Sequence, residues 1–167
     1  NSSGSLVLRH DANGWWEMES GTSNVLWWVY GFSSADVYAV GASGVVTHFD
    51  GTRWRVESEG AEFTLFGVWG ATPEALVAVG GVVTTNRPRA TIVTRRSGWA
   101  EVSTTALPPG RALFKVWGAS PTDFFVVGER GLMARGGPGA FVSSSTPTLE
   151  RLTTVHGAGA QVYAVGG

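Results

Sequence analysis

Cysteine is absent from the 167 residues of this chain. Disulfide bridges, cysteine-based zinc sites and thiol nucleophiles are therefore excluded, although the absence decides nothing about the redox compartment. Charged residues are also sparse, at 15%, and they give a net charge of -1 with no long run of either sign. This balance removes the main electrostatic argument for a nucleic-acid partner. No apolar stretch approaches the roughly 20 residues that span a bilayer, so membrane insertion is not expected.

Glycine and tryptophan are abundant instead, with 24 and 8 residues respectively. Many glycines among aromatic and β-branched residues favour numerous short strands joined by tight turns. A long helix would need a stretch without glycine, and no convincing stretch of that kind is present. The composition therefore predicts an all-β protein.

One sequence pattern occurs four times along the chain. Each copy has Leu, then Val three residues later, then an aromatic residue or His, then Gly; the copies begin at Leu26, Leu65, Leu113 and Leu152. The closing glycines, called the anchor glycines below, are spaced by 39, 48 and 39 residues and are Gly31, Gly70, Gly118 and Gly157. Repeats of this length are typical of propellers, solenoids and related arrays.

Each repeat divides into four strand-like pieces separated by turn residues. In the first complete repeat the pieces are 25–30, 37–40, 45–49 and 54–57, and Asp50-Gly51 separates the last two. Asp-Gly between apolar runs is a strong hairpin signal, because glycine accepts a positive φ without a Cβ clash. Four antiparallel strands repeated about every 40 residues predict a β-propeller, in which each repeat is one blade.

The two ends of the chain carry complementary halves of a repeat. Residues 4–20 match the third and fourth strands of a blade, and the chain closes after a second strand at 162–167. We therefore predict one propeller domain over 1–167, with four four-stranded blades. Residues 25–60, 63–105 (with an inserted loop) and 111–145 form three blades, while 151–167 and 1–20 together close the last. Such closure would remove exposed sheet edges. Two chains forming one larger ring, or a longer propeller of which this is a piece, remain alternatives.

The segments VWGASPTDFFVVG and DVYAVGASGVVTHFDGTRW resemble repeats of bacterial propellers found in large secreted or surface-attached proteins. This group is loosely similar to the BNR or Asp-box propellers and, in architecture, to tachylectin-type lectins. The resemblance implies a propeller fold over nearly the whole chain and a secreted, periplasmic or cell-surface location. It implies little about activity, since propellers share blade chemistry across unrelated functions. The arginine triad and tyrosine nucleophile of Asp-box sialidases have no match here.

The residues just before the anchor glycines form one candidate ligand-binding set. They are Tyr30, Trp69, Trp117 and His156. A ring of aromatic side chains at one mouth of a channel would stack on a sugar or a peptide. The alternative, which we favour, is that these side chains pack between neighbouring blades.

Residues that break the repeat form a second set of candidates. Trp28 corresponds to Gly67, Lys115 and Thr154 in the other repeats, so the shared architecture does not dictate it. Trp16 likewise departs from the pattern. Arg87 and Arg89 lie in the insertion at 81–90, where a loop could recognise carboxylate or phosphate or could equally be a solvated hairpin extension.

No catalytic motif, metal-binding spacing or cofactor motif is apparent, so we expect neither an enzyme nor a cofactor. The function that the sequence favours is a propeller module that binds a protein partner, as a monomer or a homodimer. A lectin with glycan pockets between blades is the alternative, and an enzyme with a site at the channel mouth is less favoured. Asp36, Glu74 and Asp123 follow the anchor glycines closely and are interpreted as turn-capping residues.

Overall fold

The computed structural model describes residues 5–83, 88–137, 140–158 and 160–167. Within these residues the chain is built of β-strands and two short 3-10 turns, which confirms the predicted all-β class. The strands are β1 (Leu6–Asp11), β2 (Gly14–Glu19), β3 (Leu26–Ser33), β4 (Asp36–Gly41), β5 (Val46–Phe49), β6 (Trp54–Ser58), β7 (Thr64–Gly70), β8 (Leu76–Val82), β9 (Arg89–Arg95), β10 (Trp99–Val102), β11 (Leu113–Ser120), β12 (Asp123–Gly128), β13 (Met133–Gly137), β14 (Ala140–Ser144), β15 (Leu152–Ala158) and β16 (Gln161–Gly166), with the 3-10 turns η1 (Ala42–Gly44) and η2 (Glu129–Gly131).

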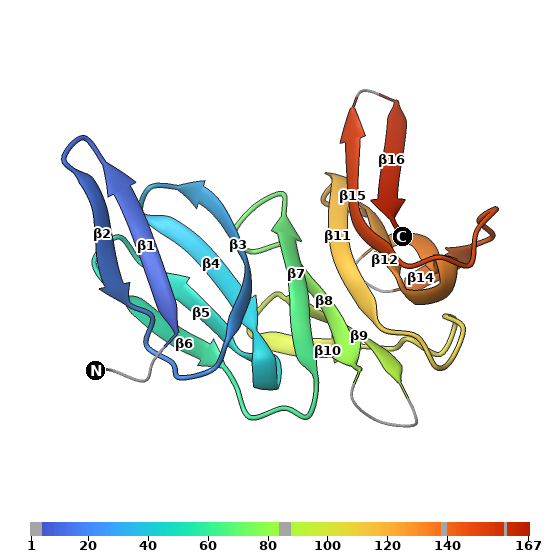
Figure 1. Ribbon diagram of the computed structural model, residues 1–167, viewed down its shortest axis with the longest axis horizontal. Coiled ribbons are helices and arrows are strands. Elements are labelled where there is room, and N and C mark those ends of the chain that lie inside the picture. The colour runs from blue at the N-terminus through green and yellow to red at the C-terminus, as the bar shows by residue number, and fades with distance from the viewer. Residues whose placement is uncertain (1–4, 84–87, 138–139, 159) are drawn as a thin grey trace.

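The strands form three four-stranded antiparallel sheets flanked by two hairpins. The first sheet contains β3 to β6, the second β7 to β10 and the third β11 to β14, each in the order of the sequence. We call the pair β1–β2 the N-terminal hairpin and the pair β15–β16 the C-terminal hairpin. The sheets and hairpins follow one another along the array in chain order (Figure 1).

The predicted closure of the last blade within one chain is not formed. Among the described strands β1 pairs only with β2, and β16 pairs only with β15. Figure 1 shows the two hairpins at opposite ends of the array. Each hairpin packs on the sheet that is next to it in sequence, and the three complete sheets between them do not bring the ends of the chain together. Complementary halves of a repeat specify how strands could pair, but they do not specify that both halves belong to the same molecule.

Apolar side chains alternate along the strands and fill the spaces between successive sheets. In β4, Tyr38 and Val40 pack toward the second sheet, whereas Ala39 packs toward the N-terminal hairpin. Successive side chains of a strand point to opposite faces, so one strand serves two interfaces. Comparable clusters join the second sheet to the third and the third sheet to the C-terminal hairpin.

The anchor glycines are required by contacts between successive sheets. A Cβ at Gly118 would lie 2.2 Å from a ring carbon of Trp69, and a Cβ at Gly157 would lie 2.0 Å from Trp117. Each tryptophan therefore lies directly over the anchor glycine of the next repeat. Tyr30 makes the corresponding contact in a different way, because its hydroxyl donates a 2.8 Å hydrogen bond to the carbonyl of Gly70.

The Asp50-Gly51 turn joins β5 to β6 as the sequence predicts. Gly51 has φ of 93°, which is the left-handed region that favours glycine. The Asp50 carboxylate accepts hydrogen bonds from the backbone N–H of Thr52 and of Arg53, both at 3.0 Å, and from Arg55 Nε at 2.8 Å. The Thr52 hydroxyl donates a further bond at 2.6 Å, and this set of donors holds the pKa of Asp50 well below its usual range.

Candidate binding site

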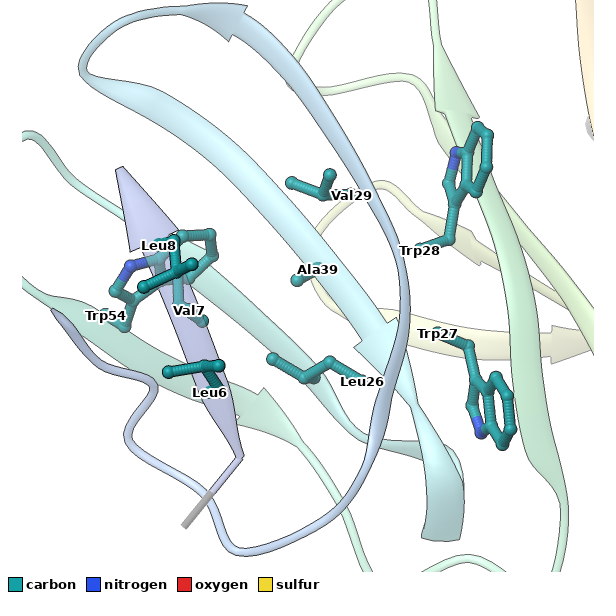
Figure 2. Close-up of a pocket in the computed structure, with 9 residues that line it drawn as sticks. All are labelled: Leu6, Val7, Leu8, Leu26, Trp27, Trp28, Val29, Ala39 and Trp54. Carbon is teal, nitrogen blue, oxygen red and sulfur yellow. The ribbon is translucent and has the colours of Figure 1, made fainter. Parts of the chain in front are cut away.

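An apolar hollow of about 300 Å³ opens between the N-terminal hairpin and the first sheet. Its lining comes from consecutive residues of β1 and β3 and from single residues of β4 and β6. The set is Leu6, Val7, Leu8, Leu26, Trp27, Trp28, Val29, Ala39 and Trp54. In Figure 2, Leu26, Val29 and Ala39 lie on the side of β3 that faces β1, while the rings of Trp27 and Trp28 lie on the side nearer the second sheet.

The hollow exposes side chains that are buried at equivalent positions elsewhere. Val29 is 58% exposed, whereas the matching residues Val68, Val116 and Val155 are 1%, 4% and 4% exposed. These three valines are covered by the sheet that precedes them. Among the described residues, Val29 is preceded only by the two-stranded N-terminal hairpin, so no inner strands cover it. The exposed apolar surface therefore arises from the half-repeat at this end of the array, not from the residues themselves.

Unpaired strand edges accompany the exposed surface at both ends of the array. Within the described strands, one edge of β1 and one edge of β16 have no neighbouring strand, as is true of every strand at the border of a sheet or hairpin. A free edge presents a row of backbone N–H and C=O groups that can pair with another strand. Leu8 on β1 is 50% exposed, and Tyr163 and Val165 on β16 are 58% and 59% exposed. Both ends of the array thus combine free backbone groups with exposed apolar side chains.

Trp28, a predicted site residue, forms a cation–π contact with Lys115. The Nζ atom lies 3.0 Å from the centroid of the ring, although the two residues belong to β3 and β11. The lysine side chain crosses β7 at Gly67, where an added Cβ would lie 3.4 Å from Lys115 Cδ. Lys115 is 9% exposed, and this burial lowers its pKa to about 8. Trp28, Gly67 and Lys115, which occupy the same variable position in three repeats, are therefore brought together across three strands.

The predicted aromatic set lies at the junctions between repeats. Tyr30, Trp69 and Trp117 are half-buried, and each lies against the repeat that follows it. Trp69 also packs edge-on against Phe124, with ring centroids 5.4 Å apart. His156 is exposed, and its ring lies 5.6 Å from that of Trp117. The first three side chains thus have the packing environment that the sequence analysis favoured, while His156 lacks a following repeat in this chain.

Trp16 and Arg89 do not line the hollow. Trp16 is 51% exposed, and its Nε1 donates a 3.0 Å hydrogen bond to Asp11 within the N-terminal hairpin. Arg89 begins β9, where it bonds to Thr91 at 3.2 Å and pairs with Glu101 at 3.5 Å. Arg87 lies outside the described residues. The described parts of the insertion continue the β8–β9 pairing, which extends to Val82 and Arg89.

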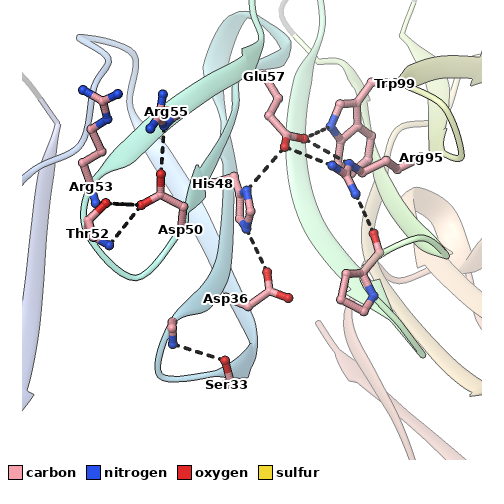
Figure 3. Close-up of polar contacts among 12 residues, drawn as sticks. Ser33, Asp36, His48, Asp50, Thr52, Arg53, Arg55, Glu57, Arg95 and Trp99 are labelled. Carbon is pink, nitrogen blue, oxygen red and sulfur yellow. Dashed lines mark hydrogen bonds and ion pairs between the residues drawn. The ribbon is translucent and has the colours of Figure 1, made fainter.

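A polar network between the first and second sheets was not foreseen from the sequence. Asp36, which lies near a turn, bonds to His48 Nε2 at 2.8 Å on the neighbouring strand (Figure 3). His48 Nδ1 lies 3.4 Å from Glu57, and Glu57 accepts hydrogen bonds from Arg95 at 3.2 Å and from Trp99 Nε1 at 2.8 Å. These charges satisfy one another across the junction, and no nucleophile lies among them. The network therefore joins the first and second sheets.

The described part of the chain contains no group of three or more His, Cys, Asp or Glu residues that could hold a metal ion. None of its helices is both long and apolar enough to cross a membrane. A scan against protein-family models and a search of curated proteins both found no match to this chain.

Proposed function

We propose that this chain is a β-propeller-type module that binds protein partners and has no catalytic activity. The observation that carries the proposal is the apolar hollow beside the free edge of β1. Large exposed apolar surfaces mark interaction sites, and a free strand edge supplies hydrogen-bonding groups for an added strand. The successive packed sheets and the repeat of about 40 residues support the propeller-type architecture.

The chemistry of the hollow favours an extended segment with alternating apolar side chains. Backbone bonds to β1 would provide affinity, and alternate side chains would enter the space lined by Leu26, Val29 and Ala39. A globular ligand with a polar surface would leave these groups uncovered. The partner class is thus a polypeptide that can add a β-strand.

The test uses a synthetic peptide of alternating Thr and Val, with a Pro-interrupted peptide as the control ligand. We expect the first peptide to change the tryptophan fluorescence and to shift backbone amide signals of β1 and β3. Leu8→Lys should weaken binding at least tenfold, or about 1.4 kcal/mol. Val142→Lys is the matched control, because Val142 is an exposed apolar residue of β14 at 70% exposure. Equal binding by both variants, or amide shifts confined to other strands, would contradict the proposal.

A lectin is the second candidate, and the exposed tryptophans of the N-terminal hairpin favour it. Trp15 and Trp16 are 69% and 51% exposed, and the Asp11 carboxylate lies beside the Trp16 indole. An exposed indole ring next to a carboxylate offers a sugar both a stacking surface and a hydrogen-bond acceptor. A glycan array decides this candidate: binding that Trp16→Ala abolishes would support a lectin, and an array without binding would remove it.

A further inference from the structure

The two hairpins are complementary halves of one four-stranded sheet. In the C-terminal hairpin, Leu152 lies opposite Gly166 and Thr154 opposite Val165, with the same register shift that β3 and β4 show at Leu26. The C-terminal hairpin therefore corresponds to the first two strands of a complete sheet. Its second strand, β16, therefore corresponds to β4, which in the complete first sheet pairs with β5.

The N-terminal hairpin corresponds to the last two strands of a complete sheet. His10 lies opposite Trp15 with ring centroids 5.0 Å apart, and Phe49 lies opposite Trp54 with centroids 5.5 Å apart. By this correspondence β1 is equivalent to β5. The free edge of β1 is then the edge at which β5 pairs with β4. Each end of the chain thus has the strand that the other end lacks, but Figure 1 places the two ends apart.

We propose that the C-terminal hairpin of a second copy of this chain fills the hollow and pairs with β1, so that two copies jointly form a complete four-stranded sheet. This inference rests on the proposed function, because it names the polypeptide that the hollow binds. It also names the strand: β16 of the second copy runs antiparallel to β1. The existing pairing of β4 with β5 provides the template.

The template defines the register of the shared sheet. Ala39 lies opposite Thr47, and Val40 lies opposite Val46. Transferring these pairs places Ala164 of the second copy opposite Leu8 and Val165 opposite Val7. The side chains then point to consistent faces. Val7 already packs on the first sheet, and Ala164 already packs on the third sheet of its own chain.

The shared sheet would bury the apolar side chains that both ends now expose. Tyr163 and Val165, at 58% and 59% exposure, correspond to Tyr38 and Val40, which are 1% and 0% exposed. Val29 would be covered by the inner strand β15, as its equivalents are in the other repeats. The association therefore reproduces interfaces that this chain already forms three times within itself.

The anchor-glycine contact also has a counterpart at the new junction. Gly31 is the one anchor glycine that no aromatic side chain of the described residues overlies, and His156 is the residue of that series with no glycine to cover. In the shared arrangement His156 of the second copy would lie over Gly31. Gly31 and His156, which lack this contact within one chain, would thus make it with each other.

Head-to-tail association closes into a ring or continues as an open polymer. Each copy contributes three complete sheets, and each junction adds one, so a closed pair of copies would contain eight. Propellers typically contain about four to eight blades, and three copies would exceed that range. We therefore infer a closed ring of two copies.

The experiment exploits the absence of cysteine from the chain. Leu8→Cys and Ala164→Cys are prepared as separate single variants, mixed and oxidised with diamide. Directly opposed residues of antiparallel strands have Cα atoms about 4.5–5.5 Å apart, which is within the range that a disulfide spans. We expect a disulfide-linked dimer from the mixture. The matched control replaces Ala164→Cys with Tyr163→Cys, which is adjacent but faces the other side of the sheet and should give little cross-linked product.

The mass of the unmodified chain in solution is measured over a concentration series by light scattering. We expect a species of twice 17.6 kDa that reverts to a single chain on dilution. Tyr163→Lys and Leu8→Lys should each shift this equilibrium toward the monomer. Equal cross-linking in the control mixture, or a monomer at every concentration, would overturn the inference. A larger polymer with the correct cross-link would support the pairing and overturn the closed ring.

The outcomes separate this inference from the proposed function. The chain could stay monomeric but bind the alternating Thr and Val peptide in a way that Leu8→Lys weakens. That result would support the proposed binding function and refute the pairing with a second copy. A monomer that binds no peptide refutes both.

Discussion

Substitution of Gly118 by alanine tests the packing between successive repeats. The added methyl carbon would lie 2.2 Å from Trp69 Cζ3 and 2.4 Å from Cη2. Nonbonded carbon atoms prefer separations of about 3.5–4.0 Å, so the ring and the strand must move apart by more than 1 Å. The ring has little room to move, because Phe124 lies 5.4 Å from it on one side and Tyr30 lies 6.5 Å away on another.

We expect Gly118→Ala to lower the free energy of unfolding by about 2–3 kcal/mol, which is the upper part of the range for overpacked cores. For a chain of this length, that loss corresponds to a fall in Tm of roughly 4–12 °C. Thermal unfolding followed by far-ultraviolet circular dichroism measures the shift. Gly98→Ala is the control, since no atom lies within 4 Å of its added Cβ. It should change the unfolding free energy by less than about 0.5 kcal/mol.

Gly31→Ala is a second control at the same position of the repeat. Its added Cβ meets only Val37 Cγ2 at 3.2 Å and two backbone oxygens at 3.6 and 3.7 Å, with no ring over it. Measured on dilute, monomeric chain, it should cost much less than Gly118→Ala. In a Trp69→Leu background the cost of Gly118→Ala should also fall, because the clashing ring is gone. Equal Tm values for Gly118→Ala and Gly98→Ala would refute the reasoning.

Two further predictions concern titration. Lys115 is the only lysine in the sequence, so its 13Cε resonance in lysine-labelled protein should titrate as a single signal near pH 8. The Lys115 ammonium group keeps its proton up to about pH 10.5 in the unfolded chain but releases it near pH 8 in the folded chain. The free energy of unfolding should therefore rise between those pH values. Lys115→Met should remove that part of the pH dependence. Folding lowers the pKa of Asp50. Its contribution to the free energy of unfolding is therefore present above the usual aspartate pKa range and is lost as the pH falls through the pKa of the folded state. Asp50→Asn should therefore make the acid limb of the Tm profile shallower, and an unchanged limb would contradict this account.

The strand content and the repeat follow from local sequence. The segment from Trp54 to Glu57 is apolar and charged in alternation, and Asp50-Gly51 precedes it with the donors and the positive φ that a tight turn needs. Such signals act over a few residues, so they can be recognised without knowledge of the fold. The four-strand division of the first complete repeat was predictable for this reason, and the structure confirms it.

The contacts between repeats depend on residues about 40 positions apart. The repeated glycines could be seen in the sequence, but only the packed sheets show that Trp69 needs Gly118 beneath it. Likewise the position that holds Trp28 in one repeat and Lys115 in another was recognised as variable, although nothing in the spacing indicated that the indole would meet the ammonium group. The pattern marks such positions, whereas the three-dimensional arrangement decides their partners.

The amino-acid sequence by itself determined the all-β class, the turns and the complementary phase of the two ends, because these depend on alternation and on glycine at particular positions. Only the tertiary structure decided that the two half-repeats stay apart and leave the hollow beside β1 open. The physical reason is that the pairing of neighbouring strands depends on residues that are close in sequence. Closure depends instead on the sum of the rotations between three packed sheets, and many side chains each contribute a small part of that sum.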